Sequence, residues 1–312
     1  MGICIQEITM TTPTPFQLIA APFTPMQPGG AIDLNRVKPY YEFLRERGVD
    51  GAFVCGTTGE GALMTAEERK QVVAAWTVAR GSDRSFRIFA HAGNDCPAVS
   101  VELARHAAES GADAVAILSP TFFKPGNEEA AVDQAAEVAA AAPNLPFYYY
   151  HIPSMTGLAL SIPRLIELAI QRIPNFAGVK FTHADLGEYL DCLSLAGDKL
   201  EILFGRDELL LFGLAAGATG AVGSTYNFMA PLYRHLIAAH GRGDAVEARR
   251  FQMESRRMIF KIVCHGGLAG QKVAMAEAGF DCGPCRLPLP RLDAGQVASI
   301  QDLFKSLPPE LQ

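Results

Sequence analysis

The sequence has 312 residues, of which 49% are apolar and 19% charged, and 27 basic against 33 acidic side chains give a net charge of −6. A chain this long and apolar can bury a large core, which excludes an intrinsically disordered protein. The acidic balance argues against a nucleic-acid or anionic-membrane binder, because both partners attract basic surfaces. The charged fraction lies below the roughly 25% of an average soluble domain, which indicates surface buried between copies of the chain.

Neither the termini nor the cysteines indicate export or membrane insertion. No stretch reaches the ~18 apolar residues that a membrane span needs. The N-terminus has no basic segment before an apolar block, and Gln6 stands where a myristoylation signal has Ser or Thr. Seven cysteines, an odd number scattered along the chain, do not resemble a disulfide framework. We expect a reduced, cytoplasmic protein.

Short apolar runs alternate with helical patterns as far as about residue 240. The runs predicted to be strands are Leu18–Pro22, Ala52–Cys55, Arg87–His91, Ala114–Leu118, Pro146–Tyr150, Phe176–Phe181, Glu201–Gly205 and Gly220–Ser224. Helical spacing of apolar residues between them predicts helices, among them Ala66–Arg80, Val99–Ser110 and Glu128–Ala142. Thr65, followed three residues later by Glu68, has the pattern of a capping box.

This alternation predicts a (β/α)8 TIM barrel. Buried parallel strands joined by helices form βαβ units, and eight such units in about 220 residues match a closed barrel. A doubly wound sheet is the alternative, but no G-x-G-x-x-G motif follows the first strand. We place the barrel at residues 16–240 and a C-terminal helical extension, packed on the barrel, at residues 241–312. The extension is expected to hold helices at Ala245–Val263, Gln271–Ala278 and Ala294–Ser306.

Reactive side chains fall at the predicted C-terminal ends of strands, where barrels of this kind carry their active sites. Lys180 lies near the end of an apolar strand, and burial would favour loss of its proton and make it a nucleophile toward carbonyls. The alternative is a lysine that reaches solvent or pairs with an acid. Tyr150 ends the fifth strand, and at most two tyrosines of the run from Tyr148 to Tyr150 can face inward together.

A glycine-rich turn follows the second predicted strand, from Gly56 to Glu60. Its backbone N–H groups and the hydroxyls of Thr57 and Thr58 could converge on a carboxylate or a phosphate. The alternative is an ordinary βα turn. A P-loop is excluded because the turn lacks the lysine of that motif.

Three motifs occur at the spacing of successive barrel units and resemble those of a known family. They are the Gly56–Glu60 turn, the segment Tyr150–Gly157 and the strand ending in Gly178–Lys180. Together they resemble the pyruvate-lyase family of N-acetylneuraminate lyase and dihydrodipicolinate synthase. The resemblance implies a class I, Schiff-base aldolase on a (β/α)8 barrel with a C-terminal helical extension, usually a homotetramer. It covers the chain from about Ala21 to Pro288.

Within this family the lyase branch is the better match. Met155 stands where the synthase branch has an arginine, and an apolar side chain cannot hold a second acidic group. The segments Gly205–Glu208 and Gly223–Asn227 resemble the lyases. The resemblance therefore implies reversible cleavage of N-acetylneuraminate (sialic acid) to pyruvate and N-acetylmannosamine. The alternatives are another pyruvate-dependent aldolase, such as a dihydrodipicolinate synthase-like enzyme with a different aldehyde, and a catalytically idle binding protein.

The resemblance also implies residue roles. Lys180 would form the imine and Tyr150 would take the proton of the C4 hydroxyl. The residues implied in substrate binding are Thr57 and Thr58 for the carboxylate, Thr182 beside them, and Gly205, Asp207, Glu208 and Ser224 for the sugar tail. Many relatives carry a tyrosine after the fourth strand that reaches into a neighbouring subunit, but Phe122 and Phe123 stand here. A two-tyrosine relay is therefore not implied.

Two other signals point to weaker alternatives. Cys282 and Cys285 have thioredoxin-like spacing, but the proline-rich stretch after them cannot form the helix that activates such a thiol. A thiol oxidoreductase is therefore the weakest alternative. No histidine pair has zinc-site spacing, and His151 is expected to be a satisfied structural donor rather than a ligand. We predict no metal and no cofactor.

Overall fold

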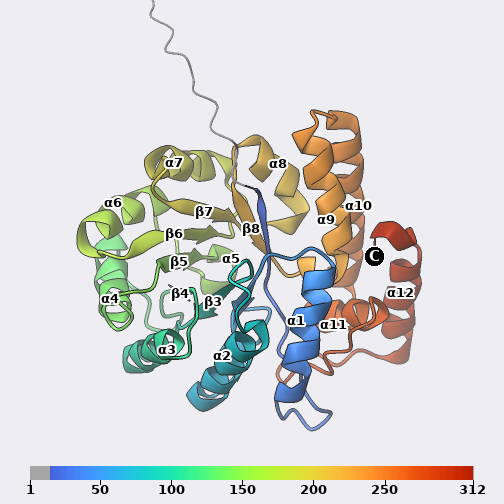
Figure 1. The fold of residues 1–312 in the computed structure, drawn as a ribbon, viewed down its shortest axis with the longest axis horizontal. Helices are drawn as coiled ribbons and strands as arrows, with labels where there is room; N and C mark the ends of the chain where they lie inside the picture. Colours follow the sequence, from blue (N-terminus) through green and yellow to red (C-terminus); the bar gives the residue numbers. More distant parts are fainter. Residues whose placement is uncertain (1–14, 312) are drawn as a thin grey trace, which may run out of the picture.

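Eight parallel strands form a closed barrel in which neighbours follow the order of the chain and β1 also pairs with β8 (Figure 1). The structure is a computed structural model that describes residues 15–311, so the prediction made on Gln6 and the N-terminus lies outside the described residues. The strands are β1 (Gln17–Ala20), β2 (Gly51–Val54), β3 (Arg87–His91), β4 (Ala114–Ile117), β5 (Phe147–His151), β6 (Phe176–Phe181), β7 (Glu201–Phe204) and β8 (Gly220–Gly223).

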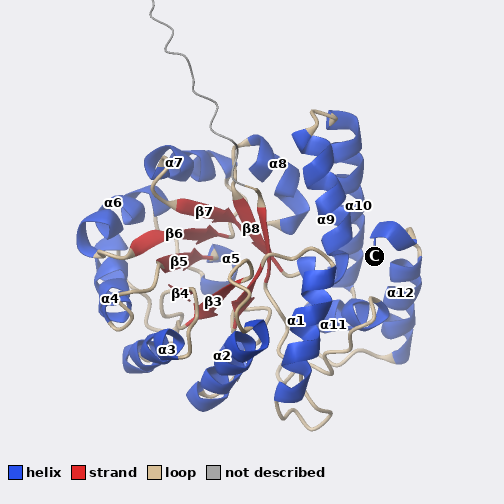
Figure 2. Cartoon of the chain, viewed as in Figure 1, coloured by secondary structure: helices blue, strands red, loops and turns tan. Residues whose placement is uncertain are grey.

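Helices surround the strands (Figure 2). Those alternating with strands are α1 (Val37–Glu46), α2 (Ala66–Arg80), α3 (Pro97–Glu109), α4 (Glu128–Ala140), α5 (Pro153–Thr156), α6 (Ile162–Arg172), α7 (Leu186–Ala196) and α8 (Leu210–Ala215). After β8 come α9 (Tyr226–Gly241), α10 (Ala245–Cys264), α11 (Leu268–Glu277) and α12 (Ala294–Lys305), gathered on one side of the barrel in Figure 1. Short 3-10 turns are η1 (Leu34–Arg36), η2 (Gly61–Leu63), η3 (Asp207–Leu209) and η4 (Pro309–Leu311). No helix within residues 15–311 is long and apolar enough to cross a membrane.

The barrel and its helices confirm the predicted fold class and exclude the doubly wound sheet. The strands β3 and β6 have the predicted bounds, and the other six differ by one or two residues at their ends. The capping box of Thr65 and Glu68 is present and starts α2 at Ala66, as predicted. The helix α11 begins at Leu268, three residues before the predicted start, directly after Gly267 with its left-handed φ of 58°.

The core has two layers, because successive strand residues point to opposite faces. One layer lies between strands and helices, and the other fills the barrel interior. Tyr148 and Tyr150 belong to the interior, whereas Tyr149 points outward and its hydroxyl lies 2.8 Å from that of Ser119. This confirms that at most two of the three tyrosines face inward. The hydroxyl of Tyr148 forms hydrogen bonds with Arg87 and Glu201 at the N-terminal end of the barrel. Of the two inward-facing tyrosines, Tyr150 is therefore the one at the C-terminal end.

Candidate active site

Lys180 points into the barrel from the C-terminal half of β6. Its side chain is buried, and its Nζ lies 3.9 Å from the ring centroids of both Phe53 and Tyr150. Burial lowers the pKa of Lys180 from 10.5 to about 7, and the charge of Asp207 opposes this shift. The side chain therefore does not reach solvent, and a large fraction of the amine is neutral near pH 7. A neutral, buried amine can attack a carbonyl carbon.

Tyr150 lies beside this amine at the end of β5. Its hydroxyl lies 3.3 Å from Oγ1 of Thr57, which comes from the turn after β2. Burial raises the pKa of Tyr150 to about 12, although the hydroxyls of Thr57 and Thr182 lower it. Tyr150 is therefore a protonated phenol near neutral pH, with a hydroxyl next to it that can exchange a proton.

The glycine-rich turn after β2 has a strained backbone. Cys55 and Glu60, at its two ends, both adopt a left-handed φ, of 60° and 59°. A Cβ on Gly61 would lie 1.9 Å from the carbonyl oxygen of Cys55, so only glycine fits there. Strain of this kind persists where the surrounding structure enforces it, and it is frequent at ligand sites. The turn leaves Thr57 exposed, with its hydroxyl next to that of Tyr150, and Thr58 half-buried.

Glu60, the last residue of this turn, is a structural anchor. Its carboxylate forms a buried ion pair with Nζ of Lys272 in α11, at 2.7 Å, and accepts a hydrogen bond from the backbone N–H of Arg286 at 2.7 Å. Lys272 also donates to the carbonyl oxygens of Thr24 and Pro284. The helical extension thus holds the turn that carries Thr57 and Thr58.

Asp207 follows β7 and is buried next to the β8 end. Its Oδ2 accepts hydrogen bonds from the backbone N–H and the hydroxyl of Thr225, at 2.9 and 2.6 Å. Its Oδ1 lies over Gly223, where a Cβ would be 2.0 Å away. Burial raises the pKa of Asp207 to about 6, and the hydrogen bonds from Thr225 and the charge of Lys180 oppose the rise. A carboxylate is thus fixed in position close to the amine of Lys180.

The remaining predicted residues also lie just past the C-terminal ends of strands, with different surroundings. Gly205 donates its N–H to the carbonyl of Phe181 in β6, and a Cβ on it would lie 2.0 Å from Oγ1 of Thr182. Gly205 therefore makes room for the Thr182 hydroxyl. Glu208 is half-buried and pairs with Arg206 at 2.6 Å. Ser224 accepts hydrogen bonds at its carbonyl from Asn227.

Several further residues of the site were not found from the sequence. Thr225 holds Asp207, and only its place in the segment after β8 could have suggested it. His91, at the end of β3, packs edge-on against Tyr150 with ring centroids 5.9 Å apart. Burial, together with the charges of Arg69 and Lys180, lowers the pKa of His91 well below its usual value, so that its ring is neutral. Arg69 is itself buried and donates to the carbonyl of His91.

Two loops at the mouth of the barrel carry apolar side chains. Met155 in α5 is 65% exposed and offers no charge to a second acidic group. Phe122 and Phe123, after β4, are 79% and 85% exposed and contact each other edge to face. Phe122 and Phe123 offer no hydroxyl for a relay.

The cysteine pair does not form an activated dithiol. Cys282 is fully buried, and burial raises its pKa to about 12 and that of Cys285 to about 11. The stretch that follows is not helical, as the prolines predicted. The cysteines of residues 15–311 are all free. A thiol that keeps its proton at neutral pH is a poor nucleophile.

The prediction for His151 as a satisfied donor is wrong. Its Nε2 is buried and makes no hydrogen bond with residues 15–311. Two residues that the sequence spacing did not connect with it, His183 and Glu188, lie next to it. The sequence could not show this because the three residues come from different elements that meet only in the folded barrel.

Comparison with known proteins places this geometry in a family. The model of the dihydrodipicolinate synthetase family matches residues 14–307. The chain belongs to that family. Within it, N-acetylneuraminate lyases of mouse and human are each 40% identical to the chain over 294 residues, which are 93% of the chain and 92% of the relative.

Solved structures of the dihydrodipicolinate synthetase family share the fold. N-acetylneuraminate lyase of Proteus mirabilis superposes with a TM-score of 0.89 at 40% identity, covering 93% of this chain and 97% of that one. The sialic acid aldolase of Aliivibrio salmonicida has a TM-score of 0.89 at 37% identity, covering 95% and 97%. A dihydrodipicolinate synthase of Bacillus anthracis has a TM-score of 0.87 at 25% identity, covering 94% and 98%. The fold is common to both branches, while the higher identities are to lyases.

Proposed function

We propose that this protein is an aldehyde-lyase that cleaves N-acetylneuraminate reversibly to pyruvate and N-acetylmannosamine through an imine on Lys180. The observation that carries the proposal is the buried amine of Lys180, with its pKa lowered to about 7, against the ring of Tyr150. The 40% identity to curated lyases over 93% of the chain supports the choice of substrate. No cofactor is required, because the lysine itself supplies the electron sink.

The reaction begins when the neutral amine of Lys180 attacks the C2 ketone of the open-chain sugar. Loss of water gives a protonated imine. The electrons of the C3–C4 bond then move toward the imine nitrogen, which leaves an enamine, while C4 becomes the aldehyde carbon of N-acetylmannosamine. Protonation of the enamine at C3 and hydrolysis of the imine release pyruvate and restore Lys180.

The C4 hydroxyl must lose its proton as the bond breaks, and Tyr150 is placed to receive it. Because the pKa of Tyr150 is raised to about 12, its phenol accepts this proton only while passing its own proton on. Oγ1 of Thr57, 3.3 Å away on an exposed residue, is the next group in such a transfer. Thr57 would take the proton of Tyr150 while releasing its own to solvent water, and the same path in reverse would protonate C3 of the enamine. One tyrosine, one threonine and water would therefore carry out the relay, consistent with phenylalanine at positions 122 and 123.

The other predicted residues would bind the two ends of the substrate. Thr57 and Thr58, with the N–H groups of their turn, would hold the carboxylate next to the imine. Oδ1 of Asp207, together with Glu208 and Ser224, would accept hydrogen bonds from the sugar tail, whose hydroxyls both donate and accept. A dihydrodipicolinate synthase-like activity is less well supported, since the exposed Met155 offers nothing to a second carboxylate.

We also propose a homotetramer in the cytoplasm. Phe122 and Phe123, at 79% and 85% exposure, are apolar surface that a subunit contact would cover. The free cysteines of residues 15–311 suit a reducing compartment. Sedimentation equilibrium tests the assembly, and a monomer at micromolar concentration would contradict it.

Trapping of the imine tests the chemistry. Incubation with pyruvate and borohydride should attach the reduced adduct to Lys180, identified by peptide mass spectrometry. Lys180→Ala should abolish both the adduct and cleavage, and Lys180→Arg should do no better, because a guanidinium cannot form an imine. Lys199→Ala, which removes an exposed lysine, is the matched control and should leave both intact.

An adduct on another lysine would refute the role of Lys180, and the absence of any adduct would favour an idle binding protein. A panel of aldehydes offered together with pyruvate separates the two branches of the family. Condensation of pyruvate with aspartate semialdehyde faster than cleavage of N-acetylneuraminate would refute the choice of substrate alone.

A further inference from the structure

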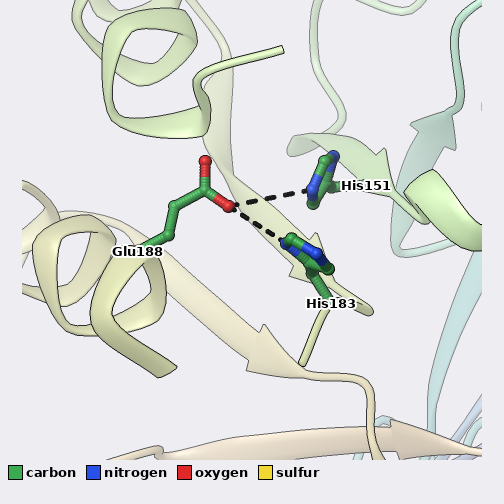
Figure 3. Close-up of side chains that lie close together, drawn as sticks. All are labelled: His151, His183 and Glu188. Atoms are coloured by element: carbon green, nitrogen blue, oxygen red, sulfur yellow. Dashed lines mark hydrogen bonds and ion pairs between the residues drawn. The ribbon is translucent and has the colours of Figure 1, made fainter. Parts of the chain in front are cut away.

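Three side chains with metal-binding atoms meet at the C-terminal rim of the barrel, on its outer side (Figure 3). His151 is the last residue of β5, His183 follows the end of β6, and Glu188 lies in the first turn of α7. One donor atom from each lies within 4.8 Å of the other two. The dashed contacts in Figure 3 run from one carboxylate oxygen to both imidazole rings.

This cluster is separate from the site of Lys180. Since neighbouring residues of a strand point to opposite faces, His151 points outward where Tyr150 points inward. Its ring packs against Phe181, a member of the outer core layer, with centroids 5.4 Å apart. The three side chains line a cavity of about 670 Å³ together with Asp185 and Asp191, and neither Lys180 nor Tyr150 is among its lining residues. The wall of the barrel stands between the two sites.

The distances are close to those of a tetrahedral metal centre. Zinc bonds of about 2.0–2.1 Å place two ligand atoms roughly 3.3–3.4 Å apart. Oε2 of Glu188 lies 3.3 Å from Nδ1 of His183 and 3.9 Å from Nε2 of His151. The pair of Glu188 and His183 already has the required spacing, and the pair of Glu188 and His151 needs a shift of roughly half an ångström. The nitrogens of the two histidines lie within 4.8 Å of each other, so their rings must also approach when the ion binds.

The carboxylate is oriented by a second contact. Oε1 of Glu188 accepts a hydrogen bond of 3.0 Å from the backbone N–H of Ile162, at the start of α6. Oε2 is thereby directed toward the two imidazoles. Metal-binding carboxylates are commonly held in this way by a hydrogen bond to the oxygen that does not ligate.

The buried nitrogen of His151 is the observation that points to a ligand. His151 is 5% exposed, and its Nε2 makes no hydrogen bond with residues 15–311. Its distance of 3.9 Å to Oε2 of Glu188 is too long for a hydrogen bond. A buried ring nitrogen without a partner is costly, and a bond to a metal ion would remove that cost.

We propose that His151, His183 and Glu188 bind one divalent transition-metal ion of the zinc class, with the fourth coordination position open to the cavity. Two imidazoles and a carboxylate are a donor set that favours zinc over magnesium or calcium, which prefer oxygen ligands alone. The ion would join the ends of β5 and β6, the strands that carry Tyr150 and Lys180, to α7. It takes no part in the imine chemistry.

The test uses the full chain after removal of metal by dialysis against a chelator. Titration with Co²⁺ should give the visible absorption of a tetrahedral site, which Zn²⁺ then displaces. Elemental analysis after gel filtration should find one zinc per chain. Glu188→Gln keeps an oxygen for the Ile162 N–H but removes the charge, and it should weaken zinc binding at least about tenfold. His183→Asn should remove the cobalt absorption.

Control variants test whether other side chains bind the zinc, and a separate measurement tests whether each variant is folded. His240→Asn removes a histidine outside the cluster and should leave binding unchanged. Replacing the exposed Cys96 and Cys264 by serine should also leave it unchanged. Far-UV circular dichroism checks that each variant is folded. His183→Asn should fold because the His183 side chain is 40% exposed, and Glu188→Gln should fold because the glutamine oxygen can still accept the hydrogen bond from Ile162.

Zinc binding that survives in folded His183→Asn and Glu188→Gln would overturn the proposal. So would binding that disappears with the two exposed cysteines, or a wild-type chain that retains no zinc after gel filtration.

Discussion

The rate of imine formation should depend on pH through the titration of Lys180. Only the neutral amine attacks pyruvate, and burial lowers the pKa of this lysine from 10.5 to about 7. At pH 7 about half of the amine is then neutral, whereas an unperturbed lysine would be neutral in roughly one molecule in 3,000. The fold thus raises the reactive fraction roughly a thousandfold at neutral pH.

Replacing Asp207 by Asn perturbs this titration in a defined direction. The charge of Asp207 raises the pKa of Lys180 and so opposes the effect of burial. The asparagine oxygen can still accept both hydrogen bonds from Thr225, so that the site keeps its shape. Without this negative charge the ammonium form of Lys180 is less stable, so the pKa of Lys180 should fall further.

The assay is the initial rate of borohydride trapping with limiting pyruvate between about pH 5 and pH 9. In the wild type the rate should rise about tenfold per pH unit below pH 7 and level off above it. In Asp207→Asn the midpoint should lie at lower pH. A wild-type midpoint near pH 10 would refute the claim that burial activates Lys180, and a midpoint that moves upward in the variant would refute the role of Asp207.

Three further changes test other parts of the structure. Asp207→Ala should lower kcat/KM for N-acetylneuraminate by roughly 10- to 150-fold, the loss expected for one charged hydrogen bond of about 1.5–3 kcal/mol. Pyruvate trapping at about pH 9, where the amine of Lys180 is neutral in both proteins, should change little. Equal losses in both assays would make Asp207 a structural residue. Lys272→Met leaves Glu60 buried without its counter-ion. The free energy of unfolding, measured in urea, should fall by about 3–5 kcal/mol. A fall of about 1 kcal/mol or less, as for an exposed ion pair, would contradict the anchoring role. Replacing Cys282 and Cys285 by serine, or removing metal with a chelator, should leave most of the turnover, because the protonated imine accepts the electron pair. Activity that is lost on chelation and restored by zinc or magnesium would refute a metal-independent mechanism.

The barrel could be predicted from the sequence because strands buried on both faces leave short, uninterrupted apolar runs. Tyr150 and Lys180 are 30 positions apart, about the length of one βα unit, so both were expected at the same end of the barrel. The distance of 3.9 Å from Nζ to the tyrosine ring confirms this. The regular spacing of strands along the sequence was enough to predict this proximity, because the two residues belong to neighbouring strands of one sheet.

Contacts that depend on how distant elements dock could not be predicted. The hydrogen bonds from Thr225 to Asp207 depend on the conformations of two loops, and no sequence period describes them. The cluster at His151 likewise requires the first turn of α7 to lie beside the ends of β5 and β6. The bond between Arg286 and Glu60 joins residues 226 positions apart, with no local signal at either end.

The anchoring of Glu60 by the helical extension has a consequence for synthesis of the chain. A ribosome completes the strands that carry Tyr150 and Lys180 long before it reaches Lys272 and Arg286. Until those residues emerge, the glycine-rich turn would have to bury a carboxylate without its counter-ion, which is unfavourable by several kcal/mol. The nascent barrel therefore carries Lys180 before the neighbouring turn is set, and the carboxylate site proposed for that turn would form only after Lys272 and Arg286 have emerged.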